Sequence, residues 1–156
     1  MKLTTKGRYA VTAMMDLALH AKLGHVTLTD IAERQAISSA YLEQLFGSLR
    51  KAGLVTSVRG PKGGYMLAQA EHDISLADIL IAADEEINLT CGNGASCSDI
   101  DPCLTHNLWN NLSQEFFQFL NDKKLNDLVR SRYVQTKATQ QDVTQIGDIP
   151  IHINRL

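Results

Sequence analysis

The spacing of apolar residues in the first part of the chain predicts three helices. Apolar side chains recur at helical spacing over residues 6–21. Thr27 lies three residues before Asp30, which is close to a capping box and predicts the start of a short second helix. Ser38 is a suitable N-cap for a third helix that runs to about Ala52. Two short helices joined by a tight turn are typical of a helix-turn-helix motif.

The two faces of the third helix differ in chemistry. At about 100° per residue, one face is apolar and is expected to be buried: Tyr41, Leu42, Leu45, Phe46 and Leu49. The other face is small and polar at its start and basic at its end: Ser39, Ala40, Glu43, Gln44, Gly47, Arg50 and Lys51. Glu43 and Gln44 suit base edges, whereas Arg50 and Lys51 suit phosphates. An ordinary solvated face would more often carry long Lys and Glu side chains throughout, so the pattern favours a recognition helix in a major groove.

A β-hairpin is predicted directly after this helix. Two runs of β-type residues, 55–59 and 65–67, flank a Gly/Pro-rich loop at residues 60–64. Arg59 and Lys62 place two positive charges at its tip, where they can reach the minor groove or phosphates. A Gly-rich loop also suits nucleotide phosphates, but the sequence has neither a Gly-Lys-Ser/Thr nor a GxGxxG pattern. After a recognition helix, the hairpin is interpreted as a wing.

The charge along the 156-residue chain is uneven. Residues 1–65 hold nine Lys/Arg against four Asp/Glu, a formal charge of +5, whereas residues 66–156 carry −7. A polyanion would be attracted to the first part, although charge also varies along ordinary chains. The sequence has no apolar run of membrane-spanning length, and its N-terminus lacks the apolar segment of a secretion signal. We therefore expect a cytoplasmic protein with no membrane partner.

All three cysteines lie in one polar segment rich in small residues. Cys91, Cys97 and Cys103 have five residues between neighbours, and His106 follows three residues after the last. A helix starting near Pro102 would put Cys103 and His106 on one face. Three thiolates and one imidazole suit either tetrahedral Zn²⁺ or an iron–sulfur cluster. The spacing lacks the tight chelate of structural zinc and fits a cluster, with three free thiols and a surface histidine as the alternative.

An apolar stripe follows on the same helix and is expected to form its buried side: Leu104, Leu108, Leu112, Phe116 and Phe119. Helix-turn-helix proteins commonly pair so that two recognition helices meet successive major grooves. The helix is therefore a candidate for dimerisation, through these residues: Leu108, Trp109, Leu112, Phe116 and Phe119. Packing within the same chain is the alternative, and the two do not exclude each other.

Four motifs together resemble one known family: residues 3–11, 41–46, 58–65 and 103–106. Their sequences are Leu-Thr-Thr-Lys-Gly-Arg-Tyr-Ala-Val, Tyr-Leu-Glu-Gln-Leu-Phe, Val-Arg-Gly-Pro-Lys-Gly-Gly-Tyr and Cys-Leu-Thr-His. They are similar to those of the IscR family of bacterial iron–sulfur cluster regulators. The resemblance extends from the N-terminus to about Val129, and the combination of wing and cysteine spacing is highly specific.

The resemblance implies a homodimeric transcription regulator, and not an enzyme, with a [2Fe–2S] cluster on Cys91, Cys97, Cys103 and His106. Such a regulator binds pseudo-palindromic double-stranded operators and receives its cluster from the cluster-assembly machinery. When loaded it represses cluster-assembly genes, and its cluster-free form regulates other sites. In this scheme Glu43 discriminates between the two classes of operator.

The predicted DNA contacts are Thr4, Lys6, Ser38, Ser39, Ala40, Tyr41, Glu43, Gln44, Arg50, Lys51, Arg59 and Lys62. Two of these positions depart from the family pattern. Ala40 stands where the family often has a serine that reaches DNA, which puts one base contact in doubt. Lys62 replaces a glycine of the wing and adds a positive charge for a phosphate contact.

The expected fold is mainly α: a winged helix-turn-helix with a small β-hairpin, and a long C-terminal dimerisation helix. Residues 1–85 are expected to form the DNA-binding domain, and residues 86–130 the cluster loop and dimerisation helix. Residues 131–156 are expected to form a mobile Gln/Thr/Asp-rich tail, in which residues 149–153 can dock as an extended segment.

Three alternative functions stay open. They are a nitric-oxide-responsive relative, which would typically lack the histidine ligand, a redox carrier or enzyme that uses the cluster, and a zinc-stabilised DNA-binding module.

Overall fold

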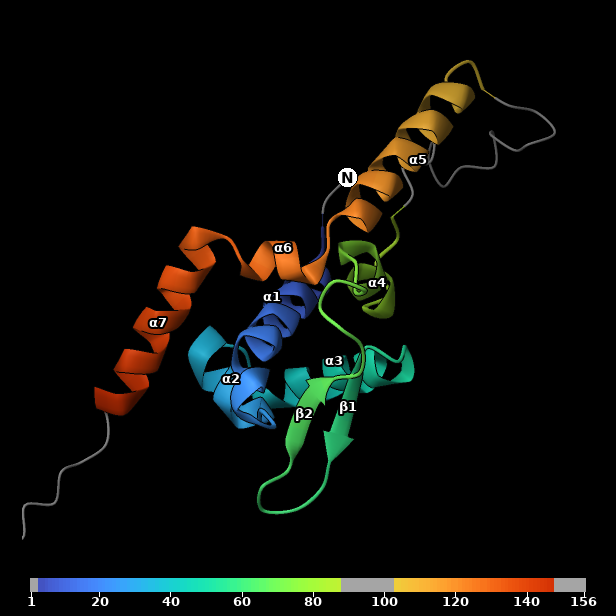
Figure 1. Cartoon of the computed structure of the whole chain (residues 1–156). Coiled ribbons are helices and arrows are strands. Elements are labelled where there is room, and N and C mark those ends of the chain that lie inside the picture. The colour runs from blue at the N-terminus through green and yellow to red at the C-terminus, as the bar shows by residue number, and fades with distance from the viewer. Residues whose placement is uncertain (1–2, 88–102, 148–156) are drawn as a thin grey trace, which may run out of the picture.

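The chain folds into a mainly helical molecule with one two-stranded antiparallel sheet (Figure 1). The computed structural model describes residues 3–87 and 103–147. Its elements are α1 (Thr5–His20), the 3₁₀ helix η1 (Ala21–Leu23), α2 (Leu28–Gln35), α3 (Ser39–Lys51), β1 (Val55–Val58), β2 (Gly64–Leu67), α4 (Leu76–Ala82), α5 (His106–Asp122), α6 (Leu125–Val129) and α7 (Arg132–Gly147). This architecture confirms the predicted winged helix-turn-helix.

Side-chain caps start α2 and α3 where the sequence predicts them. Thr27 and Asp30 form a capping box at the start of α2, and the Ser38 hydroxyl accepts a hydrogen bond from the first turn of α3. Ser75 and Asp78 form a second capping box on α4. Each cap satisfies backbone N–H groups that have no partner within their own helix. Because the capping residues lie next to these groups in the sequence, the helix starts can be predicted from short sequence patterns.

A short backbone pairing, in addition to that of β1 with β2, joins the wing to the helix-turn-helix. In the hairpin Val55 pairs with Leu67 and Val58 with Gly64. Val26, between η1 and α2, exchanges backbone hydrogen bonds of 3.0 and 2.8 Å with Tyr65. A Cβ at Gly64 would lie 2.6 Å from the Val26 carbonyl oxygen, so this approach requires glycine. The base of the wing is therefore fixed to the segment that leads into α2.

One apolar core holds the N-terminal helices together and includes part of the chain beyond α5. Its largest fully buried side chains include Met14 of α1, Ile31 of α2 and Phe46 of α3. Leu125 and Val129 of α6 are buried in the same core. The boundary expected at residue 86 therefore does not separate α6 from the DNA-binding part of the molecule. Burial of each such side chain stabilises the fold by roughly 1.5–3 kcal/mol.

Helix α5 projects away from this body (Figure 1) and differs from the prediction in two ways. It begins at His106 and not near Pro102, so Cys103 precedes the helix. Its apolar stripe is also not buried by its own chain: Leu104, Leu108, Leu112 and Phe119 are 106%, 60%, 41% and 56% exposed. Phe116 is half-buried near the base of the helix, where Leu120 is buried. Among the described residues, packing within the chain thus covers only that base.

A further helix, α7, lies where the sequence predicted a mobile tail. It is rich in Gln and Thr and has no apolar stripe, so helical periodicity gave no signal for it. Residues 149–153, for which an extended docked segment is predicted, lie outside the described residues. Within residues 3–87 and 103–147, no helix is both long and apolar enough to cross a membrane.

Candidate DNA interface and Cys/His turn

Helix α3 presents the polar face that the sequence predicts. Leu42, Leu45, Phe46 and Leu49 are buried, and Tyr41 is half-buried with its ring edge-on to Tyr9. The exposed residues are Ser38, Ser39, Ala40, Glu43, Gln44, Arg50 and Lys51. No heavy atom lies within 4 Å of the position a Cβ would take at Gly47, so the surface above it is open.

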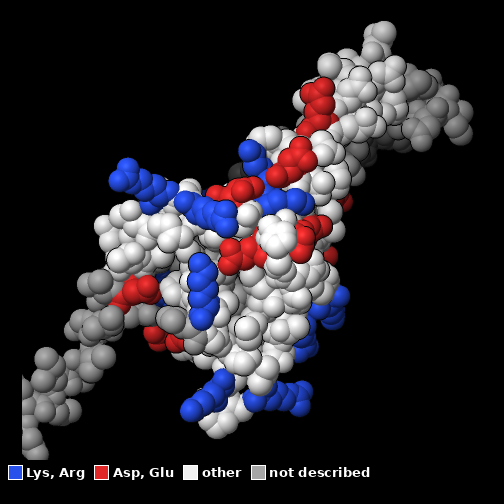
Figure 2. Space-filling model, in the orientation of Figure 1, with Lys and Arg blue, Asp and Glu red and all other residues white. Residues whose placement is uncertain are grey.

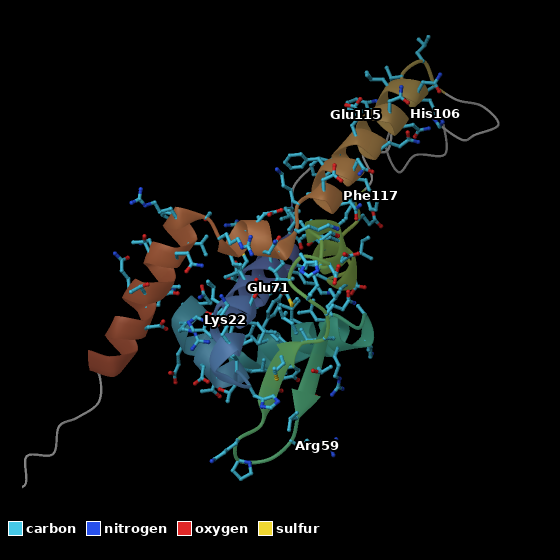
Figure 3. The ribbon with its side chains drawn as sticks, viewed as in Figure 1. Lys22, Arg59, Glu71, His106, Glu115 and Phe117 are labelled. Carbon is cyan, nitrogen blue, oxygen red and sulfur yellow. The ribbon has the colours of Figure 1, made fainter. Side chains whose placement is uncertain are left out.

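The wing is oriented relative to α3 by two side-chain contacts. The Tyr65 ring packs against Phe46 with centroids 4.8 Å apart, and Arg50 Nη1 donates a 3.3 Å hydrogen bond to Ser57 Oγ. Arg59 and Lys62 are exposed, and Figure 3 shows Arg59 at the wing tip. Basic side chains gather at that end of the molecule in Figure 2. The wing and the polar face of α3 thus form one surface suited to duplex DNA.

Two predicted DNA contacts, Thr4 and Lys6, have partners within the chain. Lys6 Nζ lies 2.6 Å from Asp84 Oδ2, and this pairing lowers the pKa of Asp84. The Glu85 carboxylate accepts hydrogen bonds from the Thr4 hydroxyl and, at 2.9 Å, from Gly7 N–H. Asp84 lies two residues after the end of α4, has a left-handed backbone (φ +56°) and directly precedes Glu85. A phosphate bound by Thr4 or Lys6 would compete with these carboxylates.

Glycine at position 7 leaves room for the Glu85 side chain in this contact. A Cβ there would lie 2.6 Å from Glu85 Cγ and 2.7 Å from Glu85 Oε1. The sequence gives no local signal for the pairing, because the partners are 78 to 81 residues apart. The acidic pair after α4 is therefore a feature that sequence reasoning missed.

Cys103 and His106 lie on one backbone turn at the start of α5. His106 N–H donates a 3.0 Å hydrogen bond to the Cys103 carbonyl oxygen, which keeps both residues in that turn. Cys103 Sγ is 3.6 Å from the Thr105 hydroxyl, and His106 Nε2 is 2.8 Å from the Asn110 amide nitrogen. A soft thiol and an imidazole, oriented by hydrogen-bonding neighbours, are a suitable pair of donors for Zn²⁺ or an iron–sulfur cluster.

The other two predicted ligands, Cys91 and Cys97, lie outside the described residues. In the part of the chain that the structure describes, no three His, Cys, Asp or Glu side chains come together as a metal site. Figure 3 shows His106 at the far end of α5, opposite Arg59 on the wing. The Cys/His turn and the DNA surface are thus separated by the length of the molecule.

A profile of the Rrf2 family, described as iron-dependent transcriptional regulators, matches residues 3–131. The chain belongs to the Rrf2 family. The matched region includes the winged helix-turn-helix, α5 and α6, and ends before α7.

Curated and solved relatives of this Rrf2 protein are transcription regulators. It is 52% identical over 143 residues to the HTH-type transcriptional regulator IscR of Pectobacterium atrosepticum, covering 91% of this chain and 87% of the relative. The structure of T. potens IscR aligns with a TM-score of 0.68 and 41% identity, over 83% of this chain and 87% of that one. CymR, the global cysteine regulator of B. subtilis, aligns with a TM-score of 0.70 and 34% identity, over 82% and 95%.

These similarities confirm the resemblance inferred from the four motifs. The protein is a DNA-binding transcription regulator of the IscR/Rrf2 type, and its relatives are not enzymes.

Proposed function

We propose that this Rrf2 regulator senses a [2Fe–2S] cluster and binds a pseudo-palindromic operator as a homodimer in the cytoplasm. When loaded it represses cluster-assembly genes, and without the cluster it regulates other sites. One observation carries the proposal. Cys103 and His106 lie on one turn at the start of α5, which exposes an apolar stripe, and the same chain has a complete winged helix-turn-helix. Cluster-assembly machinery would supply the cluster.

Duplex DNA fits the surface formed by α3 and the wing. The open polar face of α3 enters a major groove, where Glu43 and Gln44 face base edges and Arg50 and Lys51 face phosphates. Arg59 and Lys62 reach the adjacent backbone or minor groove. Ala40 is exposed but offers only a methyl group, so it can make an apolar contact and no hydrogen bond.

Arg59→Ala is expected to weaken operator binding about 10- to 100-fold. The slope of log affinity against log salt concentration should also become shallower by about one, because one phosphate contact is lost. The residue is exposed on the wing, so stability should not change. Binding isotherms at several salt concentrations measure both quantities. Arg132→Ala, which removes an exposed arginine at the start of α7, is the matched control and should behave like wild type. Unchanged affinity and salt dependence in Arg59→Ala would contradict the DNA contact.

The ligands proposed for the cluster are Cys91, Cys97, Cys103 and His106. When bound, the cluster supplies a redox-active and labile group whose loss or oxidation can be sensed. A neutral imidazole gives the site one negative charge fewer than four thiolates would, and it makes ligation sensitive to pH. Asn110 holds the imidazole of His106 in one orientation. Zn²⁺ accepts the same donors and is the alternative occupant.

Anaerobic purification with absorption spectra and metal and sulfide assays tests the cluster. We expect about two iron and two sulfide per chain, as the cluster formula requires, and loss of both in Cys103→Ala. Asn107→Ala, an exposed neighbour of His106, is the control and should retain the cluster. Full cluster retention in His106→Ala would support the ligation expected of a nitric-oxide-responsive relative. A colourless wild-type protein with one zinc per chain would overturn the cluster proposal and leave DNA binding intact.

A further inference from the structure

A buried ion pair joins α1 to the last turn of α2. The Asp16 side chain is fully buried on α1 and accepts hydrogen bonds of 2.6 and 3.0 Å from Nη2 and Nε of Arg34. Gln35 Nε2 donates a further 2.7 Å hydrogen bond to the same carboxylate. Burial would raise the pKa of Asp16, but hydrogen bonds from His20, Arg34 and Gln35 outweigh it and lower the pKa. An unpaired charge here would be strongly destabilising, so Arg34 and Gln35 are held in place.

Helix α7 contacts the residues around this ion pair through two adjacent residues, Gln141 and Asp142. Gln141 Nε2 donates a 3.0 Å hydrogen bond to the Arg34 carbonyl oxygen, and Gln141 Oε1 accepts one of 3.2 Å from Gln35 Nε2. Asp142 Oδ1 lies 3.0 Å from His20 Nε2. The hydrogen bond with Asp16 raises the pKa of His20 to about 9, so Asp142 faces a cation at neutral pH.

These polar contacts join described side chains of α7 to the DNA-binding part. Ala138 is the one buried residue among the described side chains of α7. Over residues 132–142, α7 therefore gains little from burial of apolar surface. Gln141 and Asp142 thus connect α7 to α2 and α1.

The attachment lies directly before the turn of the helix-turn-helix. Arg34 and Gln35 end α2, and Ala36 follows with a left-handed backbone (φ +52°), which is unfavourable for a residue with a Cβ. Carbonyl groups in the last turn of a helix lack partners within that helix, and Gln141 supplies one for Arg34. Two residues after Ala36, Ser38 caps the recognition helix α3. Any movement of the end of α2 is therefore passed to α3 through this short turn.

We propose that α7 braces the helix-turn-helix, with Gln141 and Asp142 as positioning residues that fix the pose of the recognition helix on operator DNA. The brace adds no contact to DNA. It raises operator affinity by reducing the number of poses that α3 samples before binding, so binding loses less conformational entropy. This bracing role rests on the DNA binding proposed for the regulator, and it does not depend on iron–sulfur cluster binding.

The test compares the full-length Gln141→Ala/Asp142→Ala variant with wild type at a temperature where both are fully folded. We expect operator affinity to fall about tenfold, with unchanged affinity for non-specific DNA and an unchanged salt dependence. Amide exchange at residues 34–38 should accelerate. Loss of a carboxylate by itself would favour DNA binding, so the expected direction is opposite to a simple charge effect.

The control Asp73→Ala/Thr136→Ala removes an exposed carboxylate and an exposed α7 side chain, and it should match wild type. Asp142→Glu keeps a carboxylate for His20 and should retain most of the affinity. If the double variant does not fold, Gln141→Ala alone gives the test at the Arg34 carbonyl. Unchanged operator affinity in the folded variant, or an equal loss for specific and non-specific DNA, would overturn the brace. Absence of operator binding in wild type would instead overturn the proposed regulator function.

Discussion

Leu112→Asp is expected to give a folded monomer whose operator affinity is at least about 100-fold below that of wild type. Leu108, Leu112 and Phe119 are 60%, 41% and 56% exposed on α5, although the sequence places them on one apolar stripe. A second copy of the stripe would cover them. An aspartate within that dimer interface would be buried without a partner, which disfavours pairing. A monomer meets one half-site, whereas the dimer meets two in successive major grooves.

The oligomeric state is measured by analytical ultracentrifugation and the affinity by operator titration of the same sample. Gln114→Asp is the matched control, because it adds the same charge to an exposed position on the opposite side of α5. It should remain dimeric and bind the operator like wild type. A Leu112→Asp protein that stays dimeric with wild-type affinity would contradict the assignment of this face.

Glu43→Ala is expected to let the cluster-free protein bind operators of cluster-assembly genes about 10- to 100-fold more tightly than cluster-free wild type. Glu43 is exposed on the polar face of α3, between Ala40 and Gly47. A carboxylate only accepts hydrogen bonds and is repelled by phosphates, so it disfavours sites that offer no donor at that position. Operator titrations of both cluster-free proteins measure the effect. Glu33→Ala removes an exposed carboxylate from α2 and should leave the operator preference unchanged.

The winged helix-turn-helix could be predicted because its signals are local. Thr27, Ser38 and Ser75 cap helices within three residues, and the Gly-rich loop joins two strands that are close in sequence. The predicted start of α5 near Pro102 is too early, because Leu104 continues the apolar spacing and Thr105 makes no side-chain cap that would mark the boundary. Local patterns therefore predict the elements of the winged helix-turn-helix, but they predict neither this boundary nor helix α7.

The remaining features depend on contacts between residues far apart in the sequence. Asp16 meets Arg34 across 18 residues, and Gln141 meets the Arg34 carbonyl across 107. Helix α6 has only five residues, too few to show an apolar period. Its two buried side chains can be assigned to the core only from their packing in the folded structure. The partners of Thr4 and Lys6 near the end of α4 belong to the same class. No periodicity or spacing encodes such pairs, so they had to come from the structure.

We propose that cluster binding by the Cys/His segment controls DNA affinity. Operator titration of one anaerobic preparation, before and after cluster removal, measures this dependence. For wild type, affinity for the operator of a cluster-assembly gene should fall at least about tenfold on removal and return on reconstitution. In Glu43→Ala the same removal should change affinity much less. Equal wild-type affinities in the two states would contradict the claim.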